Sequence, residues 1–134
     1  MHGWLRALRL HEIRGGDEES PDGCHVRWRR AAADRGAGPV ILLSHGVTLS
    51  LRTWAKQMSG LVAAGFRVVA FDHRGHGEST VGDAGHTVEN LGADVRSVLE
   101  GLDLHDVVLV GHSMGGVAAQ SLCIHHPEVA HERL

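Results

Sequence analysis

A serine lies in a glycine-rich segment, GHSMGG at residues 111–116, between an apolar run and a periodic stretch. A serine on a sharp strand-to-helix turn needs a strained backbone, and glycines two residues before and after it, Gly111 and Gly115, would let strand and helix approach. The Ser113 hydroxyl, next to His112, would then project as a nucleophile, and the Met114 N–H could donate to a developing oxyanion. A serine that only caps the helix is one alternative. A phosphate-binding loop is disfavoured because no Gly-Lys-Ser/Thr follows.

A second glycine turn follows the apolar run at residues 40–44. His45 and Gly46 come directly after that run, and a glycine there permits a tight bend that turns backbone N–H groups toward Ser113. We take the Val47 N–H as the second oxyanion donor. For His45 we favour a structural histidine, hydrogen-bonded to the backbone, over a catalytic base.

Histidines and acids also gather at residues 72–79, DHRGHGES. These residue types can hold a metal ion. Two glycines and an arginine among them favour a compact hydrogen-bonded loop over a preformed set of ligands. We therefore expect no metal site here.

Three short apolar runs, at residues 40–44, 67–72 and 106–112, are expected to be the buried parallel strands that position these motifs. Helices are expected at 52–64, from Val88 to Leu102 with Thr87 as N-cap, and at 114–126, ending before Pro127. Upstream, strands at 8–13 and 24–28 would form a hairpin joined by a turn at 15–23. The result is an α/β fold with a mostly parallel, doubly wound sheet and an N-terminal hairpin, in which sites gather at the carboxyl ends of the strands.

Length, charge and cysteine content limit the function classes. A chain of 134 residues that is 43% hydrophobic fits one globular domain. A formal charge of −3, with acidic residues interleaved among the N-terminal basic ones, makes nucleic acid a poor partner. Two cysteines are too few for a disulfide framework, and no apolar run reaches the roughly 18 residues of a membrane span. We expect a cytoplasmic protein.

In this order and at these intervals, the three motifs resemble those of the α/β-hydrolase superfamily, over about residues 39–127. The resemblance implies a partial α/β-hydrolase fold in which Ser113 is the nucleophile and the Val47 and Met114 N–H groups form the oxyanion hole. It implies hydrolysis of carboxylic esters or related small acyl substrates without a cofactor, with cofactor-free perhydrolase activity as an alternative. Serine at the elbow argues against the dehalogenases and epoxide hydrolases of the superfamily, which carry aspartate there.

The chain departs from the superfamily after Ser113. The family's triad runs Ser, then Asp or Glu, then His, but His125 would lie about 18 Å along the expected helix. We therefore expect one incomplete domain over residues 1–134, with N-terminal strands at 1–38 and the parallel core at 39–134, truncated after the nucleophile helix and inactive or nearly so alone. A non-catalytic interaction module, half of a split enzyme and a histidine-rich metal binder are the alternatives.

The strand at 106–112 is central in the superfamily's sheet. In this chain its residues 107–110 would form an open apolar edge, because the strand beyond it would come after residue 134. Open apolar edges pair with other chains. We expect self-association through this edge.

Overall fold

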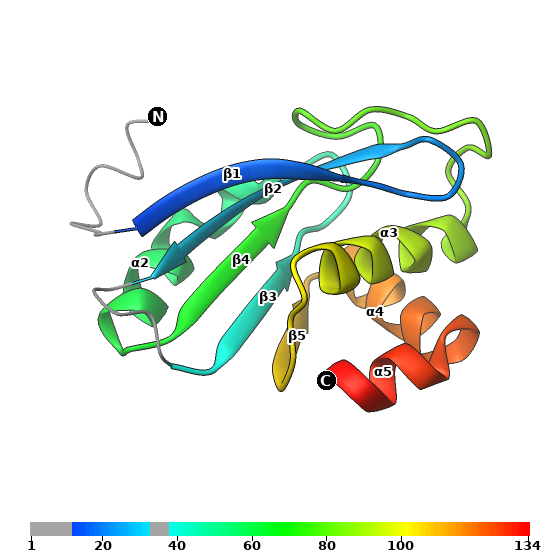
Figure 1. Cartoon of the computed structure of the whole chain (residues 1–134). Helices are drawn as coiled ribbons and strands as arrows, with labels where there is room; N and C mark the ends of the chain where they lie inside the picture. The colour runs from blue at the N-terminus through cyan, green and yellow to red at the C-terminus, as the bar shows by residue number, and fades with distance from the viewer. Residues whose placement is uncertain (1–11, 33–37) are drawn as a thin grey trace.

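The computed structural model describes residues 12–32 and 38–134 of the chain, which form a five-stranded mixed sheet in the order β1-β2-β4-β3-β5 (Figure 1). The strands are β1 (Glu12–Glu19), β2 (His25–Ala32), β3 (Val40–Ser44), β4 (Arg67–Phe71) and β5 (Val107–Gly111). β3 runs parallel to β4 and β5, and β2 runs antiparallel to β1 and β4. The three predicted parallel strands are confirmed, with the second and third slightly shorter than expected.

Helices cover both faces of the sheet. They are the 3-10 helix η1 (Leu51–Trp54), α2 (Ala55–Ala63), α3 (Val88–Gly101), α4 (Met114–His125) and α5 (Pro127–Arg133). Figure 1 shows α2 on one face and α3, α4 and α5 on the other. The core is accordingly divided in two: Leu42 of β3 packs in the cluster with α3 and α4, and Leu43 packs in the cluster with α2. Alternate residues of a strand face opposite sides, so an all-apolar strand fills both clusters.

Local signals set the helix ends. Thr87 is the N-cap of α3, and its side chain accepts a hydrogen bond from the Asn90 N–H at 3.1 Å, as predicted. From Pro127 onward the structure contains a helix that the sequence did not predict. α4 ends one residue earlier than expected, and α5 begins at Pro127 itself. Proline is well suited to the first position of a helix, and Val129 contributes to the core, so this segment gains a helix of its own.

The N-terminal hairpin exists, but its strands and turn were misplaced. β1 includes Gly15 and Gly16, which we predicted to lie in the turn between the two strands. That turn occupies only residues 20–24. Its backbone is closed by hydrogen bonds between Ser20 and Cys24 at 2.8 Å and between Gly23 and Ser20 at 2.9 Å. The reason is the pairing with β2: Gly16 lies opposite Trp28, whose ring occupies the space that a side chain on Gly16 would need. Residues 8–11 of the expected strand lie outside the described residues.

β5 lies at the edge of this sheet. Of the strands in residues 12–32 and 38–134, only β3 pairs with it. Val107 is buried, whereas Val108 is 54% exposed. The open apolar edge predicted from the sequence is therefore present in the described part of the chain. None of the helices described there is long and apolar enough to cross a membrane.

Candidate active site

Ser113 stands at the turn between β5 and α4, at the carboxyl end of the sheet. Its backbone has φ 54° and ψ −116°, in the positive-φ region that non-glycine residues rarely adopt. Its carbonyl accepts hydrogen bonds from the N–H groups of Gly116 at 2.8 Å and Val117 at 3.2 Å. The Ser113 side chain makes no capping hydrogen bond and the residue is exposed. The interpretation of this serine as a simple helix cap is therefore wrong.

The two flanking glycines are required by close backbone contacts. A Cβ on Gly115 would lie 1.9 Å from the Ser44 carbonyl oxygen, and a Cβ on Gly111 would lie 2.5 Å from the Gly116 nitrogen. Both contacts are with backbone atoms, which cannot rotate away. The steric reason predicted for Gly111 and Gly115 is confirmed: α4 can approach β3 and β5 only without side chains at these positions.

A largely apolar hollow of about 610 Å³ opens beside Ser113. Its lining brings together the three residues that the sequence reading connected, Ser113, Met114 and Val47, with Val117 and Leu91 among the apolar walls. Among the described residues, neither the Val47 N–H nor the Met114 N–H donates to a protein acceptor. Both donors are thus available to a bound group. The hollow is wide open to solvent, and the Val47 side chain is 54% exposed.

His45 is a structural histidine, as predicted. It is fully buried, its Nδ1–H donates to the Gly46 carbonyl at 2.6 Å, and its Nε2 accepts from the His73 N–H at 3.0 Å. Burial lowers its pKa below the usual value for histidine. Gly46 leaves room for the exposed ring of His112, whose Nδ1 would lie 3.0 Å from a Cβ there. With both ring nitrogens in use, His45 cannot act as a base toward Ser113.

The loop at residues 72–79 uses its polar groups on the backbone. Asp72 accepts from the N–H groups of Leu51 at 2.7 Å and Glu78 at 2.9 Å. His76 accepts from the Thr48 N–H at 3.1 Å through Nε2, and its Nδ1–H donates to a backbone carbonyl at 2.9 Å. In residues 12–32 and 38–134, no three histidine, cysteine or acidic side chains are grouped so that they could hold a metal ion. The groups that suggested metal ligands hold a compact loop instead.

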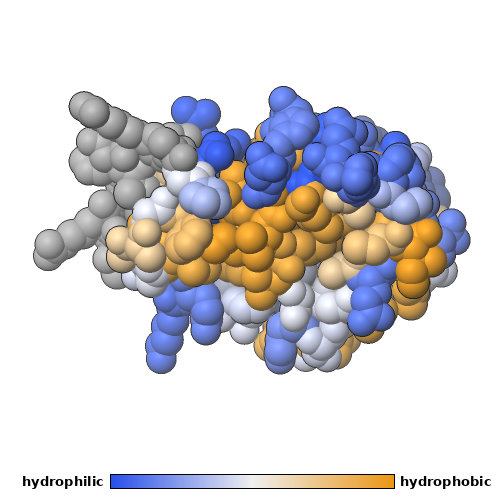
Figure 2. All heavy atoms as spheres, turned by 90° about the horizontal axis from the view of Figure 1, so that it is seen from below, coloured by the Kyte–Doolittle hydropathy of each residue, from blue (hydrophilic) through white to orange (hydrophobic). Residues whose placement is uncertain are grey.

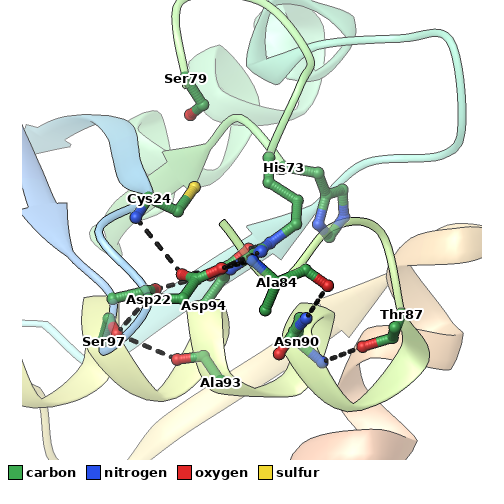
Figure 3. Close-up of polar contacts among 12 residues, drawn as sticks. Asp22, Cys24, His73, Ser79, Ala84, Thr87, Asn90, Ala93, Asp94 and Ser97 are labelled. Atoms are coloured by element: carbon green, nitrogen blue, oxygen red, sulfur yellow. Dashed lines mark hydrogen bonds and ion pairs between the residues drawn. The ribbon is translucent and has the colours of Figure 1, made fainter. Parts of the chain in front are cut away.

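A buried ion cluster fixes this loop against the rest of the molecule. The Arg74 guanidinium pairs with Asp94 of α3 at 2.7 Å and with Asp22 of the hairpin turn at 2.8 Å. Figure 3 shows Asp22 and Asp94 side by side, although one belongs to the turn between β1 and β2 and the other to α3. The hydrogen bond from Arg74 holds the pKa of Asp22 well below its ordinary range. Sequence analysis did not predict this cluster. The one indication in the sequence was an acidic residue, Asp94, one position before Val95 within the apolar stripe of α3.

No described histidine is hydrogen-bonded to Ser113. His125 bonds to Ser121, one turn back in α4, and His126 lies 3.2 Å from Arg96. The sequence reading missed His86, which lines the same hollow as Ser113. It precedes the N-cap of α3 and is exposed, and no carboxylate in the described residues braces its ring. Among the described residues, the site thus holds an exposed serine on a strained turn and two free N–H donors, but no imidazole that is both hydrogen-bonded to Ser113 and oriented by an acid.

Known proteins are similar in sequence to this chain over only part of their own length. A non-heme haloperoxidase from Rhodococcus erythropolis is 46% identical over 95 residues, which make up 71% of this chain and 33% of the relative. A bifunctional esterase/perhydrolase from Acinetobacter calcoaceticus is 47% identical over 78 residues, covering 58% of this chain and 28% of the relative. The chain therefore spans about a third or less of these curated relatives.

Solved structures match over more of the chain. An esterase from Exiguobacterium antarcticum superposes with a TM-score of 0.76 at 26% identity, covering 84% of this chain and 41% of the other. An epoxide hydrolase from Vigna radiata superposes with a TM-score of 0.74 at 29% identity, covering 87% and 36%. The family model described as the alpha/beta hydrolase fold matches residues 39–131. The chain belongs to the α/β-hydrolase fold family.

Proposed function

We propose that Ser113 is the nucleophile of an acyl-transfer reaction on carboxylic esters or related small acyl substrates, with the N–H groups of Val47 and Met114 as the oxyanion hole. The observation that carries this proposal is the conformation of Ser113. A residue held at φ 54°, with a hydroxyl that caps nothing, stores backbone strain at an exposed position. Such strain is typical of functional sites.

The chemistry follows from what surrounds that hydroxyl. Ser113 Oγ would attack the acyl carbon, and the carbonyl oxygen would gain negative charge as the tetrahedral intermediate forms. Val47 and Met114 offer N–H donors without competing acceptors, and Met114 is the first residue of α4, where the helix dipole favours negative charge. The apolar walls of the hollow suit the hydrocarbon part of an acyl substrate.

A single copy of the chain is expected to be inactive or nearly so. Ser113 needs a base within hydrogen-bond reach and a group that orients that base. His45 and His76 already use both ring nitrogens, and His73 is buried, with a pKa lowered to about 3 chiefly by its burial. Oxyanion donors and binding alone leave only a residual rate, about 10³ to 10⁴ over the reaction in water.

Perhydrolysis is the second candidate. It is favoured by the 47% identity to the relative named a bifunctional esterase/perhydrolase. The same acyl-enzyme would transfer its acyl group to hydrogen peroxide instead of water. Epoxide hydrolysis is disfavoured despite the structural likeness, because position 113 is serine rather than the aspartate that those members of the superfamily carry. A cytoplasmic location stays a prediction, as does the division of the domain at residue 38.

A fluorophosphonate probe tests the proposal. We expect slow, stoichiometric modification at Ser113, located by mass spectrometry, and none in Ser113→Ala. Ser59→Ala, on α2 away from the site, is the matched control and should react like the wild type. Modification elsewhere, or equal labelling of Ser113→Ala, would refute Ser113 as the nucleophile. Rapid labelling of dilute protein would show that a single copy does contain a working base.

A further inference from the structure

We propose that His76 is a positioning residue for the oxyanion hole, because its ring holds the turn at residues 46–49 in the strained form that presents the Val47 N–H. The role assigned to the Val47 N–H rests on the proposed function, whereas the effect of His76 on the turn does not. His76 itself does not react, and it acts only through the backbone of Thr48.

The turn at residues 46–49 has Val47 and Thr48 as its two central residues. It is closed by a hydrogen bond from the Leu49 N–H to the Gly46 carbonyl at 3.3 Å. Thr48 has a positive φ of 64°. At the third residue of a four-residue turn, this conformation is normally taken by glycine or asparagine, and for a β-branched residue it is a genuine outlier. A contact from outside the turn is therefore needed to hold Thr48 there.

The His76 ring supplies that contact. Its Nε2 accepts a hydrogen bond from the Thr48 N–H at 3.1 Å. Its Nδ1–H donates to the Arg74 carbonyl at 2.9 Å, which fixes the neutral ring with the proton on Nδ1 and leaves Nε2 as an acceptor. Within residues 12–32 and 38–134, no other hydrogen bond joins residues 47–49 to a partner outside the turn.

The backbone that carries this ring is itself held in place. The His76 N–H donates to the His73 carbonyl at 3.0 Å, and the His76 carbonyl accepts from the Ser79 N–H at 3.0 Å. The next residue, Gly77, has a φ of 53°, and a side chain there would collide with the Asp72 carboxylate. The His76 Nε2 is thus a fixed acceptor to which the turn must conform.

Buried hydrogen bonds hold the chain on either side of the turn. Before the turn, the His45 Nε2 accepts from the His73 N–H at 3.0 Å. After it, the Leu51 N–H donates to the Asp72 carboxylate at 2.7 Å. The bond from His76 lies between these two and is exposed. Its loss would leave both ends anchored, so the turn could relax while the fold persists.

Relaxation of the turn would move a donor of the site. Val47 lines the hollow beside Ser113, and among the described residues its N–H has no protein acceptor. A turn that changes from positive to negative φ at its third residue rotates its central peptide, which here joins Val47 to Thr48. An oxyanion donor must lie within about 2.7–3.1 Å of the developing charge. A shifted Val47 backbone would therefore stabilise that charge less.

The expected loss follows from the strain at Thr48. With nothing to hold it, the left-handed conformation of a residue with a Cβ is depopulated about five- to thirtyfold. The rate of Ser113 modification should fall by that factor in His76→Leu, whose side chain accepts no hydrogen bond. His76→Gln keeps an acceptor and should react at nearly the wild-type rate. Glycine adopts positive and negative φ about equally, so in a Thr48→Gly background His76→Leu should cost only about twofold.

Rates of Ser113 modification by a fluorophosphonate probe test this positioning in the full chain. Exposed apolar surface promotes association, and Figure 2 shows a hydrophobic band across the face seen from below. All variants are therefore compared at one low concentration. His25→Ala, which removes the exposed His25–Asp17 pair, is the control and should react like the wild type. The proposal is overturned if His76→Gln loses as much as His76→Leu, or if His76→Leu loses as much in the Thr48→Gly background as without it.

Nuclear magnetic resonance tests the turn without any reaction. The His76 ring should carry its proton on Nδ1. Positive φ brings the N–H and Hα of one residue close together, so the Thr48 nuclear Overhauser effect between them should be strong in the wild type and His76→Gln, and weak in His76→Leu. A proton on Nε2, or an unchanged Thr48 effect in His76→Leu, would overturn the proposal. If the turn behaves as expected but Ser113 reacts in no variant, the proposed function fails and the effect of His76 on the turn stands.

Discussion

Replacing Gly115 by alanine should destabilise the protein, although alanine is the better helix former. In helix interiors, alanine is favoured over glycine by about 1 kcal/mol. At position 115 the new Cβ would lie 1.9 Å from the Ser44 carbonyl oxygen and 2.8 Å from the His45 carbonyl oxygen. Contacts below 3.0 Å do not occur, so α4 must move by roughly 1 Å relative to β3. Such overpacking costs about 1–3 kcal/mol, occasionally more, so the net effect should be destabilising.

Gly116→Ala is the matched control, one residue further along the same helix. A Cβ on Gly116 meets nothing closer than the Gly111 carbonyl oxygen at 3.9 Å, so this variant should be stabilised by about 0.5–1 kcal/mol. Urea unfolding followed by circular dichroism gives both free energies of unfolding. We expect changes of opposite sign. If Gly115→Ala is as stable as Gly116→Ala, the close contact between α4 and β3 is wrong.

Two further predictions concern the stability that buried ionisable groups, Arg74 and His73, give to the fold. Arg74→Ala should lower the free energy of unfolding by about 3–5 kcal/mol, because it leaves Asp94 and Asp22 without their cation. The control Arg96→Ala, on the exposed face of α3, should lower it by under about 1 kcal/mol. Equal losses of the two variants in urea unfolding would count against a buried ion cluster. Because the pKa of His73 is lowered to about 3 in the folded state, only the unfolded chain binds its proton below pH 6.5. The free energy of unfolding should therefore fall by about 2 kcal/mol from pH 6.5 to 5 because of this residue. His73→Gln should lose correspondingly less stability over the same pH range. If its stability depends on pH as the wild type's does, His73 is not the buried neutral group that causes the loss.

Sequence reasoning located the parts of the site that local rules determine. The strand at 40–44, the Thr87 cap and the glycines at 111 and 115 could be predicted because each depends on neighbouring residues or on one close contact. Hydrophobic runs without alternation also identified the buried strands correctly. The position of Ser113 between strand and helix followed directly from these elements.

The N-terminal hairpin could not be placed in the same way. Glycines normally mark turns, and two of them, Gly15 and Gly16, lie inside β1. Their place is decided by pairing with β2, where the Trp28 ring lies over Gly16. A glycine in a strand often makes room for a neighbour. Trp28 was the one residue in the sequence that could have indicated such a neighbour for Gly16.

The partners of the charged residues were also beyond a local reading. Arg74 looked like part of a loop motif, yet its carboxylates come from the hairpin turn and from α3. His86 reaches the hollow beside Ser113 only because the loop before α3 folds across the carboxyl end of the sheet. Such contacts join residues distant in sequence, and no periodicity encodes them.

The central claim, that Ser113 faces an oxyanion hole formed by two backbone N–H groups, can be tested by a crystal structure of the Ser113 phosphonate adduct. We expect the phosphonyl oxygen to lie about 2.7–3.1 Å from both the Val47 and Met114 nitrogens. A phosphonyl oxygen that points to solvent, or that is held by other groups while both N–H donors stay unused, would contradict the account.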